Sequence, residues 1–244
     1  MFLFITLISL LAGMLIGTIG IGGVILAPLL AFALGFDLHL AMSASSFSFL
    51  FPGLVGTLTY AKKRSIVWEK VLWLSVGIVP AALLGARVNS YLDTAVLILI
   101  IASLITFSGI NVFLKTADES EEIPQISKLW MIFIGAVVGF GSALTGTGGP
   151  VLLVPILVTL RFPALKSIGI SQAVQLPIAL FAVAGFWLYG QIDFGLGLHL
   201  GITQAVGAYF GAQMAHRLPV VQLRRLVAVA LIGVGSMMIW QIFR

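Results

Sequence analysis

The stretch Thr18-Ile19-Gly20-Ile21-Gly22-Gly23 interrupts an apolar run over residues 2–34 and brings three glycines together. A comparable stretch, Thr145-Gly146-Thr147-Gly148-Gly149-Pro150, lies in the second half of the chain. A glycine costs a helix interior about 1 kcal/mol and a proline about 3 kcal/mol, so we expect the helix to open at both stretches. Irregular backbone at membrane depth must be buried in protein or line a cavity. These two glycine breaks, the first and the second, are therefore the leading candidates for a ligand site.

The composition is that of an integral membrane protein. Of the 244 residues, 60% are hydrophobic and 9% are charged, and the mean hydropathy is +1.17. Apolar stretches long enough for a bilayer recur along the chain and no polar block could fold separately, which predicts a single membrane domain over residues 1–244. The first four residues lack a basic region, so we expect the N-terminus to belong to the fold and not to a signal peptide.

The charge and the absence of cysteine exclude several kinds of chemistry. With no cysteine, the chain forms no disulfide and no thiolate-ligated metal site. The net charge of +5 fits cytoplasmic loops beside anionic headgroups, so we expect a lipid bilayer as partner and no nucleic acid.

The chain is predicted to contain a duplicated unit. A shift of 126 residues, the distance from Gly20 to Gly146, also pairs Gly22 with Gly148, Gly23 with Gly149, Phe36 with Phe162, Ser45 with Ser171, Ile66 with Ile192, Gly85 with Gly211, Leu92 with Leu218 and Gly109 with Gly235. Repeat 1 covers residues 1–114 and repeat 2 covers residues 129–244, with an acidic linker over 115–128. Each repeat holds a broken segment and three further spans, which repeat 1 places at about 38–60, 67–89 and 93–114.

Charge indicates that the two repeats are inverted in the membrane, because equivalent loops differ in sign. The turn Lys62-Lys63-Arg64 corresponds to the loop that contains Gly190-Gln191-Ile192, next to Asp193. If each broken segment returns to the side it entered, all of the 13 Lys and Arg except Arg87 and Arg244 fall on one face. If each segment crosses once, the cations divide almost evenly. The positive-inside rule selects the first model, in which a re-entrant hairpin and two short spans remain alternatives.

The membrane interior offers hydrogen-bonding groups but no carboxylate. No Asp or Glu lies inside a predicted span, and no His, Cys or acidic cluster has metal-ligand or catalytic spacing, so we expect no cofactor, no metal and no enzyme activity. Backbone amides at a helix start suit an oxyanion without a buried cation. The predicted substrate-binding residues are Thr18, Gly20, Gly22, Gly23, Ser45, Ser46, Gly146, Thr147, Gly148, Gly149, Ser171, Gln172 and Gln175. The alternative is that glycines only allow close helix packing, which we expect for Gly85, Gly207 and Gly211.

The chain resembles the TauE/SafE sulfite exporter family, also called the toluene-sulfonate uptake permease family. The resemblance rests on Gly17-Thr18-Ile19-Gly20-Ile21-Gly22-Gly23 followed by Pro28, on Ser45 and Ser46, and on Gly146-Thr147-Gly148-Gly149-Pro150. It covers essentially the whole chain, although Ile21 and Thr147 interrupt a glycine run that is often longer in relatives. It implies transport of sulfite, sulfonates or related organosulfur acids across a bacterial inner membrane.

The residues and the resemblance together predict an all-α polytopic membrane protein with two inverted repeats. Its expected function is secondary transport of a small anion, of the sulfur-containing class, by alternating access. A passive anion channel is the alternative within transport, and a membrane-integral enzyme or a non-transporting component is the alternative outside it. The anion, the direction of transport, the coupling ion and the oligomeric state are left open by the sequence.

Overall fold

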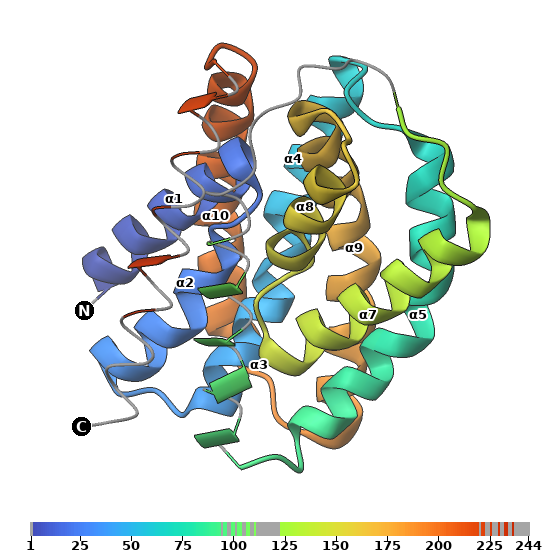
Figure 1. The fold of residues 1–244 in the computed structure, drawn as a ribbon. Helices are drawn as coiled ribbons and strands as arrows, with labels where there is room; N and C mark the ends of the chain where they lie inside the picture. The colour runs from blue at the N-terminus through green and yellow to red at the C-terminus, as the bar shows by residue number, and fades with distance from the viewer. Residues whose placement is uncertain are drawn as a thin grey trace.

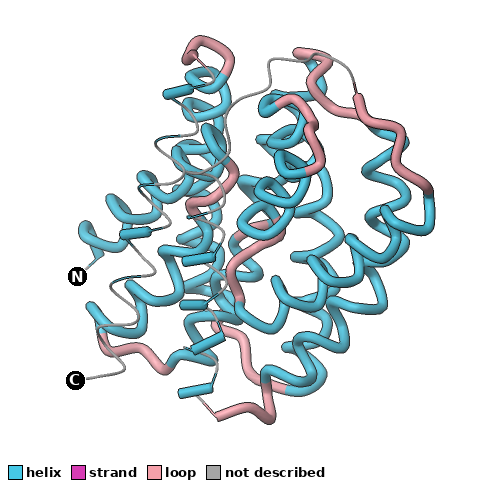
Figure 2. Tube along the Cα trace, in the orientation of Figure 1, coloured by secondary structure: helices cyan, strands magenta, loops and turns pink. Residues whose placement is uncertain are grey.

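The computed structural model describes residues 2–93, 95–96, 99–100, 102–103, 106–107, 110, 123–219, 221–222, 225, 229, 232–233 and 236. Within these residues the fold is helical and contains no strand (Figures 1 and 2). The elements are α1 (Phe2–Ile19), α2 (Gly23–Pro28), the π-helical turn η1 (Leu29–Ala33), α3 (Leu38–Ser48), α4 (Leu50–Lys62), α5 (Trp68–Asn89), α7 (Lys128–Thr145), α8 (Pro150–Thr159), α9 (Ala164–Tyr189) and α10 (Phe194–Ala215). The all-α prediction is confirmed. Most of the predicted span 93–114 and most of the acidic linker lie outside the described residues, as do Arg224 and Arg244.

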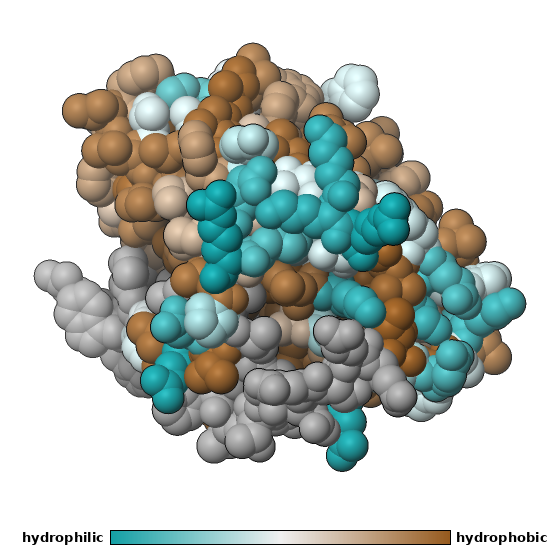
Figure 3. Space-filling view, turned by 90° about the horizontal axis from the view of Figure 1, so that it is seen from above, coloured by the Kyte–Doolittle hydropathy of each residue, from teal (hydrophilic) through white to brown (hydrophobic). Residues whose placement is uncertain are grey.

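Five helical stretches are long and apolar enough to cross a membrane. They are Phe2–Ile19, Leu38–Lys62, Trp68–Asn89, Lys128–Thr145 and Ala164–Tyr189. Large apolar side chains on their outer faces are exposed, such as Leu3 at 72% and Leu129 at 80%. Seen from the upper end of Figure 1, hydrophilic residues gather across the middle of the molecule and hydrophobic ones border them (Figure 3). This distribution suits a bilayer around the flanks and water at the end.

Two aspartates stand at the starts of helices, outside the predicted spans. Asp37 begins α3 by accepting a hydrogen bond from Leu40 N at 3.0 Å, and Asp193 begins α10 by accepting one from Leu196 N at 2.9 Å. Carboxylates favour this position because they pair with an otherwise free amide and with the helix dipole. These side chains therefore fix where two helices start.

Helix bounds in the two halves correspond at the predicted offset. Phe49 and Gln175, which bond each other, are 126 residues apart. Adding 126 to the bounds of α5 (Trp68–Asn89) gives the bounds of α10 (Phe194–Ala215). In Figure 1 α5 runs from the upper to the lower end and α10 from the lower to the upper. Ser65, just before α5, accordingly bonds His216 at the end of α10, with 3.1 Å between Oγ and Nε2. The inverted arrangement of two repeats across a membrane stays a prediction.

Two helix pairs pack backbone against backbone through glycine. A Cβ at Gly13 would lie 2.6 Å from the Cα of Gln204, and one at Gly211 would lie 2.9 Å from the carbonyl carbon of Met14, so α1 and α10 are in close contact. Gly85 and Gly139 bring α5 and α7 together in the same way. The predicted packing role of Gly85 and Gly211 is confirmed, and Gly207 has it too.

Candidate functional site

The two glycine breaks meet in the interior of the protein. A Cβ added to Gly20 would lie 3.0 Å from the Cβ of Pro150, and one added to Gly23 would lie 2.6 Å from the carbonyl oxygen of Thr147. Residues 16–24 and 142–155 are buried throughout. Figure 1 shows α2 leading from the first break towards the lower end and α8 leading from the second towards the upper end. Segments far apart in sequence thus form one buried junction.

Glycine is required at the turns of this junction. Gly20, Gly146 and Gly148 have φ angles of 79°, 61° and 77°, a left-handed conformation that side chains rarely adopt. Gly146 ends α7 in this conformation. The expectation that the helices open at the breaks is therefore confirmed, with α1 ending at Ile19 and α7 at Thr145.

Main-chain amides at both breaks are left without a protein acceptor. Within the described residues, the N–H groups of Ile21 and Gly22 in the first break, and of Thr147, Gly148 and Gly149 in the second, make no hydrogen bond to backbone or side chain. Neither α2 nor α8 has a side-chain cap at its start. Buried amides are almost always paired. A cluster of free donors in the membrane interior therefore points to a ligand that accepts hydrogen bonds.

The threonines of the breaks, in contrast, are occupied by bonds within the protein. The Thr18 hydroxyl donates to Met14 O at 2.6 Å, and the Thr145 hydroxyl donates to Gly141 O at 2.7 Å. Thr147 bonds Thr145, with 2.8 Å between the two hydroxyl oxygens. Since Thr145 has given its proton to Gly141, Thr147 is the donor in that pair. The protons of these three hydroxyls are therefore used within the protein and are not available to a ligand.

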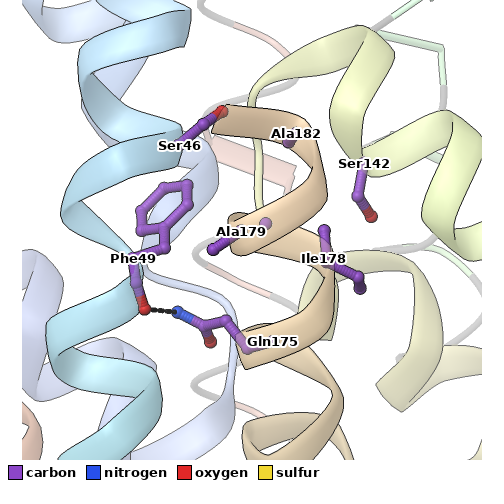
Figure 4. Close-up of a pocket in the computed structure, with 8 residues that line it drawn as sticks. Ser46, Phe49, Ser142, Gln175, Ile178, Ala179 and Ala182 are labelled. Atoms are coloured by element: carbon purple, nitrogen blue, oxygen red, sulfur yellow. Dashed lines mark hydrogen bonds between the residues drawn. The ribbon is translucent and has the colours of Figure 1, made fainter. Parts of the chain in front are cut away.

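A narrow enclosed space lies beside the second break, where α3, α4, α7 and α9 converge. It is too narrow to admit a water molecule, so the volume accessible to water is about 0 Å³. It is lined by Ser46, Phe49, Ser142, Gly148, Gln175, Ile178, Ala179 and Ala182 (Figure 4). Among these, the hydroxyl of Ser142 and the side-chain oxygen Oε1 of Gln175 are buried without a partner. This space is the candidate binding site.

The predicted site residues divide between this space and its surroundings. Ser46, Gly148 and Gln175 line the space, and the rest of the second break adjoins it. Gly22 packs elsewhere, because an added Cβ would meet Ala12 O and lie 2.8 Å from Ile16 N in α1. Substituting Gly22 would therefore disturb the fold.

Three further predicted residues are buried but are not among those lining the space. Ser171 donates to Ser167 O at 2.7 Å. Gln172 donates through Nε2 to Ile16 O, so its carboxamide anchors the end of α1. Ser45 is fully buried and its hydroxyl has no partner. We expected Gln172 to be a donor for the anion, but the structure uses that donor to hold a helix end.

Sequence reasoning missed two side chains that hold the helix ends at the breaks. Tyr60 donates from its hydroxyl to Gly17 O at 2.9 Å, and Asn89 donates from Nδ2 to Leu144 O at 2.6 Å. Each carbonyl lies in the last turn of a helix, where it lacks an intrahelical partner. The available signal was that Tyr60 and Asn89 are polar groups ending apolar spans, which an interfacial position explained equally well.

Ser142 and Phe49 were also missed, for different reasons. Ser142 precedes Thr145 by three positions and so shares its helix face, a signal that the sequence did offer. Phe49 looked like one more apolar residue in the span 38–60. In the structure it separates α3 from α4, and its ring lies 3.3 Å from a Cβ placed on Gly148. Its carbonyl accepts from Gln175 Nε2 at 3.1 Å.

The two halves differ in how they fill equivalent positions. By the predicted offset Ser46 corresponds to Gln172, and Gly56 corresponds to Ala182. Where α4 packs against α9, the Gln172 carboxamide lies over Gly56. A Cβ added to Gly56 would be 2.9 Å from Cδ of Gln172. Ser46 and Ala182, the counterparts, line the enclosed space. The long Gln172 side chain therefore fills one position, while the short Ser46 leaves its counterpart open.

A second, polar cavity of about 320 Å³ lies where α3 begins and α5 and α9 end. It is lined by Asp37, His39, Leu40, Asn89, Ser90, Phe186, Tyr189, Gly190 and Gln191. His39 Nδ1 and Asn89 Oδ1 are 3.1 Å apart, and Asn89 also holds Leu144 O beside the second break. Arg87 lies over the Tyr189 ring at 5.3 Å. Asn89 thus connects a polar opening with the buried junction.

No group of three or more His, Cys, Asp or Glu that could hold a metal ion occurs in the described part of the chain. The chemistry that the junction offers consists of neutral hydrogen-bonding groups. Their arrangement suits reversible binding of an anion.

Comparison with known proteins agrees with this architecture. A family model described as "Sulfite exporter TauE/SafE" matches residues 5–238. The "Probable membrane transporter protein YdhB" of Bacillus subtilis is 23% identical over 228 residues, covering 90% of this chain and 93% of the relative. A "Probable membrane transporter protein" of Xylella fastidiosa is 25% identical over 241 residues, covering 95% and 92%. One from Methanocaldococcus jannaschii is 24% identical over 204 residues, covering 77% and 73%. No solved structure matches. The chain therefore belongs to the TauE/SafE sulfite exporter family of membrane transporter proteins.

Proposed function

We propose that the chain is a secondary transporter that moves a small sulfur-containing oxyanion across the bacterial inner membrane by alternating access. The observation that carries this proposal is the set of unpaired amides at the two glycine breaks. Hydrogen bonds to a charged ligand are each worth about 1.5–3 kcal/mol, so a few donors offset the desolvation of an anion without trapping it. The family of the chain supports sulfite or a sulfonate as the substrate.

The closed state of the site favours a carrier over the alternative of a passive channel. The enclosed space has no room for water, so an ion needs a conformational change to enter or leave it. Asn89, which lines the polar cavity, also holds Leu144 O beside the second break. Alternating access would open the site first to one side and then to the other.

Counterflow in liposomes tests the proposal. Vesicles containing the purified protein are loaded with unlabelled sulfite and diluted into radiolabelled sulfite, with ethanesulfonate and chloride as parallel solutes. A carrier gives saturable, transient accumulation of label that depends on the internal substrate. Non-saturable flux without this dependence would indicate a channel. Absence of protein-dependent flux of any sulfur oxyanion would refute the substrate class.

A further inference from the structure

Two buried acceptors of the described residues, the Oε1 atoms of Gln172 and Gln175, have no hydrogen-bond partner, and of these only that of Gln175 belongs to a residue that lines the enclosed space. Gln175 lies on α9, is 1% exposed, and lines the enclosed space. Its Oε1 has no hydrogen-bond partner. An anion with no proton would place negative oxygen against this oxygen, which is repulsive. A site built for such an anion would not present a bare carbonyl oxygen.

The orientation of the Gln175 carboxamide is fixed by its neighbour. Its nitrogen Nε2 lies 3.1 Å from the carbonyl oxygen of Phe49, which can only accept. Reversing the amide would bring two carbonyl oxygens together and leave the NH₂ group free. The nitrogen must therefore face Phe49, and Oε1 is the atom left over (Figure 4).

The rest of the lining supplies donors and no ionisable side chain. Ser46 and Ser142 carry hydroxyls, and Gly148 carries one of the unpaired amides. None of the residues that line the space is an Asp, Glu, His, Lys or Arg. In this structure none of these donors bonds Gln175 Oε1, so the hydrogen bond that this oxygen lacks can be supplied by a donor on the ligand.

We propose that Gln175 accepts a hydrogen bond from the bound anion, and that the species carried is a singly charged oxyanion that retains its own O–H or N–H donor. This rests on the proposed function and specifies the substrate of the same site. Hydrogen sulfite has this chemistry among inorganic anions, and hydroxyalkane- or aminoalkane-sulfonates have it among organic ones. The donors of the lining bind the charged oxygens of the anion, and Gln175 Oε1 accepts a hydrogen bond from its protonated group.

The test compares pairs of ligands in which one member carries the O–H donor and the other lacks it. Affinities of the purified protein are measured by calorimetry for sulfite on the acidic and alkaline sides of its second ionisation, and for 2-hydroxyethanesulfonate against ethanesulfonate. We expect the donor-bearing member of at least one pair to bind about tenfold or more tightly, the effect of one hydrogen bond to a charged group. A preference in the sulfite pair alone identifies an inorganic anion, and one in the sulfonate pair identifies an organic anion.

Variants attribute the preference to one atom. Gln175→Met removes the acceptor with little change in volume and should abolish the preference. Gln172→Met, the same change one turn away and outside the lining, should keep it. Equal affinity of the wild type for both members of both pairs would overturn the inference, as would a preference that survives in Gln175→Met. Loss of saturable counterflow in the wild type would instead refute the proposed function, so the two failures are distinguishable.

Discussion

Filling the enclosed space with a glutamine would test whether it is the binding site. In the structure Gln172 fills the position equivalent to Ser46, because Gly56 leaves room for its carboxamide. The double variant Ser46→Gln/Ala182→Gly places the same pair, a glutamine facing a glycine, at the equivalent positions beside the enclosed space. The new side chain should occupy the space that Ser46 and Ala182 leave.

The expected loss follows from the contacts that the ligand would forfeit. The Ser46 hydroxyl is replaced and access to a second donor, Gly148 or Ser142, is blocked. At about 1.5–3 kcal/mol for each hydrogen bond to a charged group, two lost bonds cost about 3–6 kcal/mol, or roughly 100-fold to 10⁴-fold in affinity. Ser46→Ala, which removes one hydroxyl without filling the space, should cost one such bond, or roughly 10-fold to 100-fold in affinity.

Calorimetry with sulfite measures these affinities, and thermal unfolding checks the fold. Ala182→Gly alone serves as the control, with an expected cost of about 1 kcal/mol in stability from a glycine in a helix. Wild-type affinity in a folded Ser46→Gln/Ala182→Gly protein would refute the assignment of the site.

Three other predictions concern stability and topology. Tyr60→Phe leaves the carbonyl of Gly17 unsatisfied and should lower the free energy of unfolding by about 1–3 kcal/mol in denaturant titrations; an unchanged midpoint would mean that this bond contributes nothing. Burial lowers the pKa of His216, and Lys63 lowers it further. The stability that neutral His216 contributes is complete above the unfolded pKa of about 6.5 and is lost as pH falls through the lowered folded pKa, so thermal melts of His216→Gln should depend less on pH in that range than those of the wild type. If the Lys63 end is cytoplasmic, an impermeant thiol reagent added outside cells should label Asp193→Cys but not Lys63→Cys, and the reverse pattern would overturn the topology.

The sequence predicted the parts of this fold that depend on local chemistry. Clustered glycines cannot hold a helix together whatever surrounds them, so both breaks, with Gly20 and Gly146 in left-handed turns, were predictable. The prediction that no Asp or Glu lies inside a span is of the same kind, and Asp37 and Asp193 accordingly stand at helix starts, where a carboxylate pairs with a free amide. These features need no knowledge of which helix packs on which.

Features that depend on distant partners were not predictable. Gln172 was expected to bind the anion, but its amide finds Ile16 O, 156 positions away. Phe49 gave no sign that its carbonyl would fix the orientation of Gln175. A hydrogen-bonding side chain in an apolar span predicts that it has a hydrogen-bond partner. Whether that partner is a ligand or a helix end depends on tertiary packing.

The pairing of α1 with α10 has a consequence for biosynthesis. Thr6 on α1 bonds His199 on α10 across 193 positions of sequence, with 3.0 Å between the two atoms. At about 5–20 residues per second, a ribosome needs about 10–40 s to make the intervening chain. During that interval the glycine face of α1 lacks the helix that covers it. The partner of α5, which is α7, follows much sooner in the sequence. We therefore expect truncation before α10 to leave α1 exposed to membrane quality control even when every earlier helix has been inserted.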